Sequence, residues 1–596
     1  MESRIKAVTA LGLFVLLLSL DACHQDDGKK DDAQPVSELV AVTPSVSIAG
    51  PKRLRFSWDD VGADHYQLLK NPEGISGYSP VGGEIKATRV DEVIAVHLTD
   101  WDNVSYVVEA CTRNGVCVDS VPLSTSGLMI DAIGRLFPTY DPIYQNDFGP
   151  DCTTEFAMEN CYGHAMAMSG EGAVMAMGYG ADDVAARGVD GIPVEPYDYS
   201  MGQNSGAVFV FTRQGDGWST ESFIKSSSPH AGDLFGMSVA LSRDGTMLAV
   251  GAPFEDARVS GESDTSMEDT EAVYLFTRTV AGWIESGYIT IGNNEQGGEQ
   301  FGLFVSLSSM GDRLAVRSQE KVYLYHDVGS EWRLEEAWDG AQFVNDTNAK
   351  TGMFALSGDG MTFALTASSD SSIPPETGSL GLVYIYMFNG VEWVGQGRVM
   401  ASNADVDDYF GGAVSLSDDG NILAVGANRE DSSALGVNGD GTDNSAESSG
   451  AAYLFERQGS EWRQTAYLKA SNAQQGDSFG ARLVLSGDGR SLVVTAPGED
   501  SLASGINGLQ TDDRAEAPPG AAYRFLRDEA GWHQEAYIKA PHTRSGDHYE
   551  LPICGPEGCV SNEYFGDSLA ISTDGSTLMI GVPGRAFVGS GSVYLY

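Results

Sequence analysis

The chain has 596 residues, with 84 acidic against 36 basic side chains and a formal net charge of −48. The acidic residues are spread along the chain and are not gathered in one tail. A negative field of this kind disfavours nucleic acid and anionic membrane surfaces, because their phosphate groups are repelled. We therefore expect no nucleic-acid partner, and contact with a membrane only through an anchor.

The N-terminus has the pattern of an export signal. Basic residues precede an apolar run from Ala7 to Leu20, which is too short for a convincing membrane span. The tetrapeptide Leu20–Cys23 resembles a bacterial lipobox, in which the cysteine is acylated and becomes the new N-terminus. The alternative is an ordinary signal peptide with a cysteine nearby. We expect a signal peptide over 1–22, a lipid-anchored polar linker over 23–39, and a lipoprotein at the outer membrane, at the cell surface or in the periplasm.

Cysteine usage agrees with export. Apart from Cys23, six cysteines remain, and they form three close pairs in the sequence: Cys111 and Cys117, Cys152 and Cys161, Cys554 and Cys559. In an oxidising compartment such pairs indicate local disulfides. Neither a histidine nor a second cysteine pair lies at zinc spacing, which disfavours a metal role. The connectivity stays open, because spacing alone does not prove it.

Residues 40–125 form a separate module. Alternating strands surround Trp58 and Tyr66, and a further strand near Tyr106 ends in a turn between two cysteines. The segment resembles a fibronectin type III domain, with Trp58 as the early core tryptophan and Tyr106 as the late core tyrosine. Its length of about 85 residues suits a seven-stranded sandwich. Nothing in it indicates catalysis, so we expect a spacer or interaction module.

Residues 126–596 repeat one unit of four short strands. In the copy from Phe410 to Ser471, three apolar runs are separated by turns, and a fourth run follows Trp462. Asp419-Gly420 is a hairpin signal, because glycine tolerates the positive φ of a tight turn. Six further copies begin at Tyr162, Phe235, Phe301, Gly352, Phe479 and Phe565. Such a sheet cannot bury its faces alone, so the copies must pack against one another.

The last copy lacks an outer strand, because the chain ends at Tyr596. Closing a ring of sheets requires that strand to come from elsewhere, or an edge is left open. A segment within Leu128–Tyr140 has a suitable position and pattern. We predict that it pairs with Gly591–Tyr596.

The dipeptide Phe-Gly opens several copies and Gly-Ala-Pro closes them, as in Phe235-Gly236 with Gly251–Pro253 and in Phe479-Gly480 with Ala496-Pro497. These units resemble FG-GAP repeats, which build the seven-bladed propeller of the integrin α-subunit head and of many bacterial surface proteins. The resemblance implies an all-β chain, with a fibronectin type III-like β-sandwich before a seven-bladed β-propeller of four-stranded antiparallel blades. WD40 or TolB-like propellers share the tag at Ser242–Ala249, but they do not usually repeat FG and GAP around it.

The same resemblance raises the question of calcium. Integrin-like repeats carry a calcium loop between FG and GAP, and here that position is shortened to tight turns such as the one at Ser417. A second place is the longer loop before the third strand of the fifth copy, where oxygen-bearing side chains suit a hard cation such as Ca2+. The candidate ligands there are Glu430, Asp431, Asn438, Asp440 and Asp443. The alternative is a solvated acidic loop whose glycine and asparagine residues make turns.

Signals for catalysis are sparse. The sequence contains no zinc-protease, nucleophile-elbow or phosphate-loop motif, and we assign no catalytic residue. The best polar cluster is His542, Asp547 and His548, in the insertion Pro541–Glu563, which a pair of Cys554 and Cys559 would make rigid. It is a candidate metal or ligand loop, and the alternative is a polar loop that decorates a blade.

Three functions remain open. The favoured one is a monomeric, lipid-anchored binding or adhesion protein, whose loops on one propeller face contact a protein or a glycan. The second is a lyase or hydrolase with its site at the central channel, and the third is a passive envelope scaffold. Fold alone does not decide among them. An enzyme should bring charged groups with perturbed pKa values together from several blades, whereas a binder should show a broad loop face with exposed aromatic side chains.

Overall fold

The computed structural model describes residues 39–596 outside a set of gaps. The longer gaps cover 97–102, 137–164, 192–203, 256–270, 292–298, 340–349, 369–380, 512–517, 542–552, 561–564 and 583–591. All of the regular elements in the described part are β-strands. A helix that is long and apolar enough to cross a membrane is not found among these residues. Six residues singled out from the sequence lie outside the described part: Cys23, Cys152, Cys161, His542, Asp547 and His548.

The N-terminal part consists of two antiparallel sheets. One has the order β1-β2-β5 and the other β4-β3-β6-β7, with β8 also pairing with β6. The strands are β1 (Ser45–Gly50), β2 (Arg53–Ser57), β3 (His65–Asn71), β4 (Ser79–Ile85), β5 (Arg89–Val93), β6 (Ser105–Cys111), β7 (Cys117–Asp119) and β8 (Leu123–Ser124). Phe56 of β2 meets Tyr106 of β6 with ring centroids 4.7 Å apart, so the two sheets share one core. A disulfide joins Cys111 to Cys117 across the β6–β7 turn.

The rest of the described chain forms four-stranded antiparallel sheets, and it contains seven of them. The first three are β10 (Met166–Met168), β11 (Val174–Tyr179), β12 (Ala207–Gln214) and β13 (Gly217–Ile224); β14 (Ser238–Leu241), β15 (Met247–Ala252), β16 (Ala272–Thr279) and β17 (Gly282–Ile289); and β18 (Phe304–Leu307), β19 (Arg313–Arg317), β20 (Lys321–Asp327) and β21 (Trp332–Asp339). The next three are β22 (Lys350–Leu356), β23 (Thr362–Ser368), β24 (Leu382–Phe388) and β25 (Trp393–Val399); β26 (Phe410–Leu416), β27 (Ile422–Ala427), β28 (Ala451–Gln458) and β29 (Glu461–Leu468); and β30 (Leu483–Leu485), β31 (Ser491–Ala496), β32 (Ala521–Asp528) and β33 (Gly531–Ile538). A separate hairpin of β34 (Ile553–Gly555) and β35 (Gly558–Val560) places Cys554 opposite Cys559 in register.

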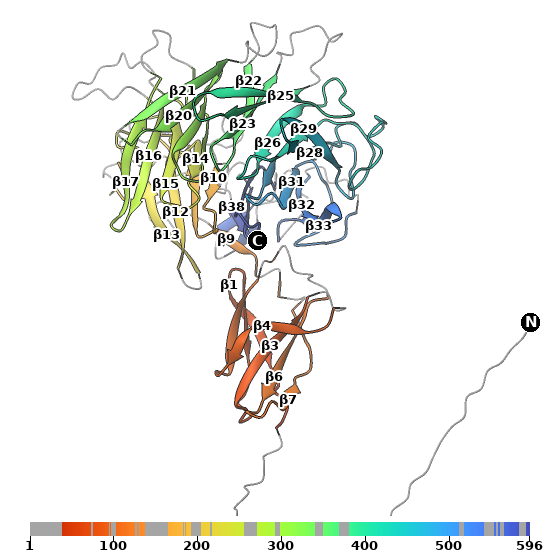
Figure 1. Cartoon of the computed structure of the whole chain (residues 1–596). Coiled ribbons are helices and arrows are strands. Elements are labelled where there is room, and N and C mark those ends of the chain that lie inside the picture. Colours follow the sequence, from red (N-terminus) through yellow and green to blue (C-terminus); the bar gives the residue numbers. More distant parts are fainter. Residues whose placement is uncertain are drawn as a thin grey trace, which may run out of the picture.

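The last of these sheets takes a strand from the beginning of the repeat region. Its order is β36 (Ser568–Ile571), β37 (Leu578–Val582), β38 (Ser592–Leu595) and β9 (Gly134–Leu136). Val593 pairs with Leu136, and Leu595 pairs with Gly134. Figure 1 shows β9 beside β38, close to the C-terminus. The predicted closure by a segment within Leu128–Tyr140 is therefore confirmed.

The sheets are arranged around a common axis. The first strand of each sheet contacts the first strand of the next, and β36 contacts β10. Seven backbone hydrogen bonds of 2.6–3.0 Å also link the turns that follow these first strands. They run from Gly170 N to Arg243 O, Arg243 N to Ser309 O, Ser309 N to Gly358 O, Asp359 N to Asp418 O, Asp418 N to Gly487 O, Asp488 N to Thr573 O, and Thr573 N back to Gly170 O. The bonds form a closed circle, which we call the turn ring.

The FG and GAP glycines lie where neighbouring sheets approach most closely. A Cβ on Gly426 of β27 would lie 2.1 Å from the carbonyl oxygen of Gly480, which begins the next sheet. A Cβ on Gly251 would lie 2.0 Å from the carbonyl oxygen of Gly302. The preceding phenylalanine anchors the same seam: Phe479 is fully buried and meets Tyr523 edge-on at 5.4 Å. The glycines of the FG and GAP motifs are therefore required by close backbone-to-backbone contacts between neighbouring sheets.

One boundary differs from the sequence prediction. The outer strand of the fifth repeat was expected to follow Trp462, but β29 begins at Glu461 and pairs Trp462 with Arg457. The hairpin before it is short, so the tryptophan is already part of the strand. A register shift between Leu454 and Phe455 accommodates the twist of this pair.

We predict that Gly426→Ala destabilises the protein, because the new methyl group must displace the Gly480 carbonyl. Overpacking of this kind costs about 1–3 kcal/mol, and denaturant unfolding should show the loss. Gly395→Ala in β25 is the matched control, since a Cβ there meets only a Tyr386 ring carbon at 3.8 Å. Equal unfolding free energies for the two variants would contradict the proposed role of the seam.

Candidate functional site

The loop between β27 and β28 folds back on the outer strand of its own sheet. Val437 forms a bridge with Leu468, and the Lys469 amide donates to the Gly436 carbonyl at 2.8 Å. The Asn438 amide donates to the Tyr467 carbonyl at 2.7 Å, while the Asn438 side-chain oxygen accepts from the Tyr467 amide at 3.0 Å. The loop therefore covers part of an edge strand whose polar backbone groups would otherwise face solvent.

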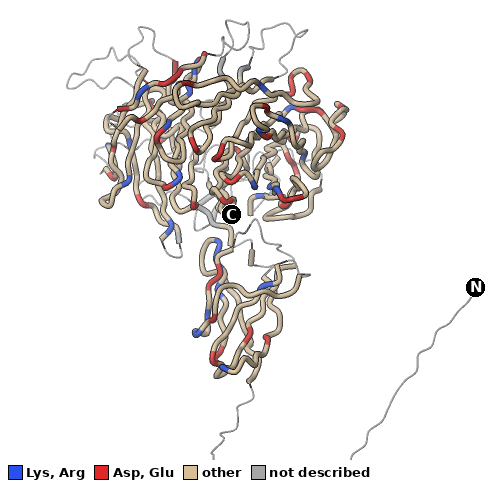
Figure 2. The backbone as a smooth tube through the Cα atoms, in the orientation of Figure 1, with Lys and Arg blue, Asp and Glu red and all other residues tan. Residues whose placement is uncertain are grey.

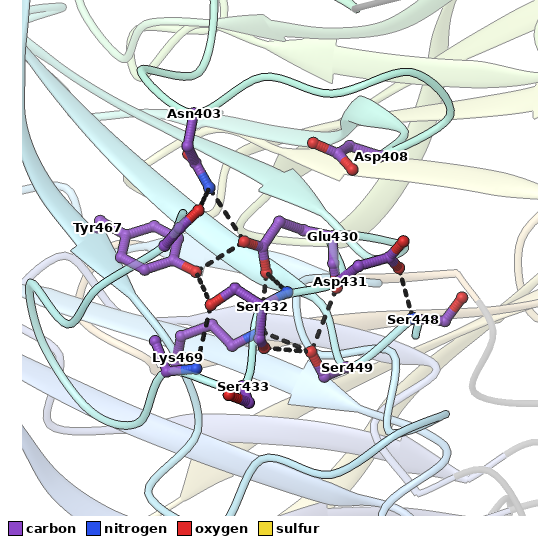
Figure 3. Close-up of polar contacts among 12 residues, drawn as sticks. Asn403, Asp408, Glu430, Asp431, Ser432, Ser433, Ser448, Ser449, Tyr467 and Lys469 are labelled. Carbon is purple, nitrogen blue, oxygen red and sulfur yellow. Dashed lines mark hydrogen bonds and ion pairs between the residues drawn. The ribbon is translucent and has the colours of Figure 1, made fainter. Parts of the chain in front are cut away.

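A buried ion pair lies beneath this loop (Figure 3). The Lys469 ammonium donates to Glu430 Oε2 at 2.8 Å and to Ser449 Oγ at 2.7 Å, and both charged side chains are nearly inaccessible to solvent. The Tyr467 hydroxyl and the Asn403 amide donate to Glu430 Oε1 at 2.8 and 3.0 Å. Burial lowers the pKa of Lys469, and the adjacent Glu430 carboxylate opposes that shift. Both oxygens of Glu430 are thus held by protein donors.

The same arrangement occurs in two other sheets. Lys539 donates to Glu499 at 2.5 Å, and Lys225 donates to Asp182 at 2.7 Å. In each case the loop bridges the outer strand, through Ile506 with Ile538 and through Val189 with Ile224. A buried charge is costly unless it is paired and hydrogen-bonded. The pairs therefore fix the first residues of all three loops to the sheet beneath them.

The predicted calcium ligands lie on this loop, but they do not converge. The Asp431 carboxylate accepts from the Ser448 amide at 2.8 Å, and Asp440 Oδ1 accepts from the amide and the hydroxyl of Thr442 at 3.1 and 2.7 Å. Hydrogen bonds from Ser445 and Ser433 hold the pKa of the Asp443 carboxyl at about 2.

Potential metal ligands come together at only one place among the described residues. Within the part of the chain that the structure describes, three ligand atoms come within 4.8 Å of one another only at Glu109, Cys111 and Cys117. Cys111 and Cys117 are joined by the disulfide. Glu430, Asp431, Asp440 and Asp443 therefore do not form one coordination sphere in this arrangement.

The shortened turns between FG and GAP use their acidic residue to close the hairpin. Ser417 Oγ donates to Asp419 Oδ1 at 2.6 Å, and the same oxygen accepts from the Asn421 amide at 3.0 Å. The Ile422 amide donates to Ser417 Oγ at 3.0 Å. Serine–aspartate bonds of 2.5–2.7 Å recur at Ser242–Asp244, Ser308–Asp312, Ser357–Asp359, Ser486–Asp488 and Ser572–Asp574. The oxygens therefore act in local turn geometry.

Two further carboxyl groups are perturbed, and both precede an FG dipeptide. Burial raises the pKa of Asp477 to about 7, although a backbone hydrogen bond from Gln474 opposes the shift. Burial likewise raises the pKa of Asp408 to about 6. Each group also faces the carboxylate of a lysine–carboxylate pair, Glu499 for Asp477 and Glu430 for Asp408. These groups lie at seams between sheets and not at the axis.

At the turn ring, two charged side chains from different sheets meet. Arg243 donates to Asp418 Oδ2 at 2.9 Å, and the two residues are 175 positions apart in the chain. Burial raises the pKa of Asp418, and the Arg243 guanidinium opposes that shift. An enzyme is expected to gather charged groups from several sheets at the axis. Around Asp418, the carboxylates of Asp359, Asp419 and Asp488 also raise its pKa, so Arg243 meets a group of acidic side chains here.

The loops at the opposite end of the sheets expose apolar side chains. They lie between the second and third strands and between successive sheets, and the exposed fractions are 42% for Val406, 55% for Tyr409, 54% for Leu435, 39% for Leu502 and 82% for Leu509. The Arg429 guanidinium lies over the Tyr409 ring, 4.8 Å from its centroid. We call these five residues the apolar loop set. The sequence alone did not single them out, because isolated apolar residues in loops belong to no recognisable motif.

The repeated four-stranded antiparallel sheets and the glycine seams between them define a β-propeller repeat protein. A model of the FG-GAP repeat matches residues 218–276 and 393–455 of this chain. No curated protein matches the sequence.

Solved structures give only distant similarities. A protein from Lactobacillus plantarum is 11% identical, with 80% of this chain and 98% of that chain covered, at a TM-score of 0.37. Sqt1 from Chaetomium thermophilum is 11% identical, with 74% and 95% covered, at a TM-score of 0.37. The β-propeller domain of Cps50 (Swd1) from Myceliophteria thermophila is 9% identical, with 73% and 97% covered, at a TM-score of 0.39. At these values the alignments say nothing about function.

We predict that Lys469→Met strongly destabilises the propeller, because it leaves Glu430 charged and buried without its cation. Removing one partner of a buried pair costs about 3–5 kcal/mol. The double variant Lys469→Met with Glu430→Gln should recover part of this loss. Denaturant unfolding of the unaltered chain, the two single variants and the double variant measures the coupling energy between the two side chains.

The matched control is Arg463→Met, which breaks an exposed pair with Glu461. Exposed pairs contribute about 0–1 kcal/mol. An effect of Lys469→Met no larger than that of Arg463→Met would show that the buried pair does not hold the loop.

Proposed function

We propose that this chain is a lipid-anchored binding or adhesion protein that contacts a protein or a glycan through the loop face of its propeller. The observation that carries the proposal is the combination of buried lysine–carboxylate pairs with apolar side chains exposed on the same loops. Loops that are already ordered lose less conformational entropy on binding, so their contacts yield more affinity. Leu435 and Leu502 lie on loops that are fixed in this way by Glu430 and Glu499.

The proposal includes a finer description of the architecture. We infer a seven-bladed propeller of the integrin α-subunit type, and support comes from the closed turn ring and from β9 completing the last sheet. We also infer that residues 40–125 form a fibronectin type III-like module. The packing of Trp58 against Tyr66 at 5.3 Å, with Tyr106 fully buried, supports this assignment.

The apolar loop set lies in acidic surroundings. Asp405 and Asp407 flank Val406, and Asp440 and Asp443 follow Leu435 on the same loop. An apolar centre with a charged rim is the usual composition of a protein–protein contact surface. The acidic rim favours a ligand with basic or hydroxyl groups, since carboxylates accept hydrogen bonds but do not donate them.

We predict that the double variant Tyr409→Ala with Leu435→Asp lowers ligand retention at least tenfold. Loss of a central aromatic or aliphatic contact typically costs more than about 1 kcal/mol, and a tenfold change corresponds to about 1.4 kcal/mol. Beads coated with the mature chain would be assayed on arrays of glycans and of purified extracellular proteins.

Val391→Asp is the matched control, because Val391 is 87% exposed on the β24–β25 hairpin, at the other end of the sheets. Retention by this variant should equal that of the unaltered chain. Absence of any ligand for the unaltered chain, or an equal loss in the control, would refute the loop face as the binding surface.

We further propose that Cys23 carries the lipid that anchors the chain, with residues 23–39 as the tether. We predict that Cys23→Ser moves the protein from the membrane fraction to the soluble fraction, because a serine cannot form the thioether. Metabolic labelling with a radioactive fatty acid, followed by fractionation of bacterial cells, measures both effects. Continued labelling of the Cys23→Ser variant would place the lipid elsewhere.

A further inference from the structure

The N-terminal sandwich meets the propeller at Lys52. The Lys52 amide donates to the Ala132 carbonyl at 2.7 Å. Its ammonium reaches into the last sheet, where it donates to the Ser576 carbonyl at 3.0 Å and to Thr577 Oγ1 at 3.1 Å. Figure 2 shows that Asp and Glu are widespread on the chain, whereas Lys and Arg segments lie on both sides of this junction.

A small cleft that opens to solvent, with a cavity volume of about 10 Å³, lies between the two parts. Its lining comes from β2, β5, β12, β13 and the turns beside them: Pro51, Lys52, Arg53, Val93, Arg213, Trp218 and Thr577. The set includes three cationic side chains and no carboxylate. In a chain with a net charge of −48 such a lining is unusual, and it gives the cleft a positive local field.

Lys52 is buried without a close ion-pair partner among the described residues. Only 8% of the residue is exposed, and among the described residues no carboxylate lies within 4.0 Å of the Lys52 ammonium or of the Arg213 guanidinium. Burial and then the Arg213 guanidinium lower the pKa of Lys52, Asp574 in the β36–β37 turn opposes both effects, and the resulting pKa is about 7. The two hydrogen-bond acceptors of Lys52 are neutral, and a buried ammonium with neutral partners alone is costly.

The backbone at Lys52 is also held in a rare conformation. Its φ is 57°, in the left-handed region that a lysine seldom adopts. Conformations of this kind cost about 1–3 kcal/mol and are retained at ligand clamps and other functional sites. The turn therefore directs a charged side chain into the junction at a cost in stability.

We propose that a small oxyanion, that is, a carboxylate, sulfate or phosphate group, binds at the open mouth of the junction cleft, between Lys52 and Arg213. An anion would supply the counter-charge of the buried ammonium through a short charge-assisted hydrogen bond. The planar guanidinium of Arg213 offers two parallel donors to such a group. Because Lys52 belongs to the sandwich and Arg213 to the propeller, the bound group would bridge the two parts. This site is independent of the loop face proposed above.

The test uses the full mature chain and three probes at constant ionic strength: sulfate, acetate and a short acetylated peptide with one glutamate. We expect saturable binding by titration calorimetry and a rise in melting temperature with ligand concentration. Arg213→Gln and Lys52→Met should each weaken sulfate binding at least tenfold, and Arg463→Gln should leave it unchanged. Arg213 is exposed, so its variant separates loss of the site from loss of the fold.

The pH dependence gives a second measurement. Sulfate keeps its charge between pH 6 and pH 8.5, whereas the Lys52 ammonium loses its proton near pH 7 in the field of Arg213, Arg53 and Asp574. Binding should therefore be weaker at pH 8.5 than at pH 6, and this difference should disappear in Lys52→Met.

The probes also separate the two sources of the ligand group. Tighter binding of the peptide than of acetate would assign the site to a carboxylate carried by another molecule, whereas preference for sulfate would assign it to a free ion. The absence of saturable binding by all three probes would overturn the proposal. Equal sulfate affinity in the unaltered chain and in Arg213→Gln would overturn it as well, since it would show an adventitious ion only.

Discussion

Closure of the ring is the constraint on which the large part of this structure depends. Each sheet has an apolar face that only another sheet can cover, and a row of such sheets would leave one face and one edge bare at each end. The pairing of β9 with β38 gives the last sheet its fourth strand, and the turn ring fixes the inner ends of the sheets to one another. The glycine seams then set the spacing, because neighbouring backbones approach more closely than a side chain allows.

Ring closure also explains where variation is tolerated. The turn ring and the seams occupy the inner strands, so their geometry admits little change. The loops between the second and third strands lie at the other end of the sheets from the turn ring, and they differ in length from sheet to sheet: the β19–β20 connection is a tight turn, whereas the β27–β28 loop is long. Three of these loops are fixed by a buried lysine, which makes them an ordered surface supported by the rigid sheets.

The sequence was sufficient for the elements and for the closure, because both follow from local pattern. Alternation, hairpin signals and the seven copies predict the sheets, and the missing outer strand predicts its replacement. The contacts of the β27–β28 loop were harder to predict from the sequence. Glu430 was singled out as an oxygen ligand, and the structure places it against Lys469. A comparison of the copies would have shown the signal, since in three of them a lysine follows the outer strand and an acidic residue begins the preceding loop: Lys225 with Asp182, Lys469 with Glu430 and Lys539 with Glu499. The contact between Arg243 and Asp418 had no such signal, because it joins non-adjacent copies and depends on the closed ring.

The pairing of β9 with β38 sets the order in which the sheets can assemble during synthesis. β9 leaves the ribosome before the other strands of its sheet, and its partner β38 is the last of the described strands to be made. At about 5–20 residues per second, the interval between them is roughly 20–90 s. The earlier sheets can stack on one another during that interval, but the closing contact must wait until β38 has left the ribosome. The ring therefore closes in one late step, and until β38 is available the stacked sheets keep one uncovered face at each end.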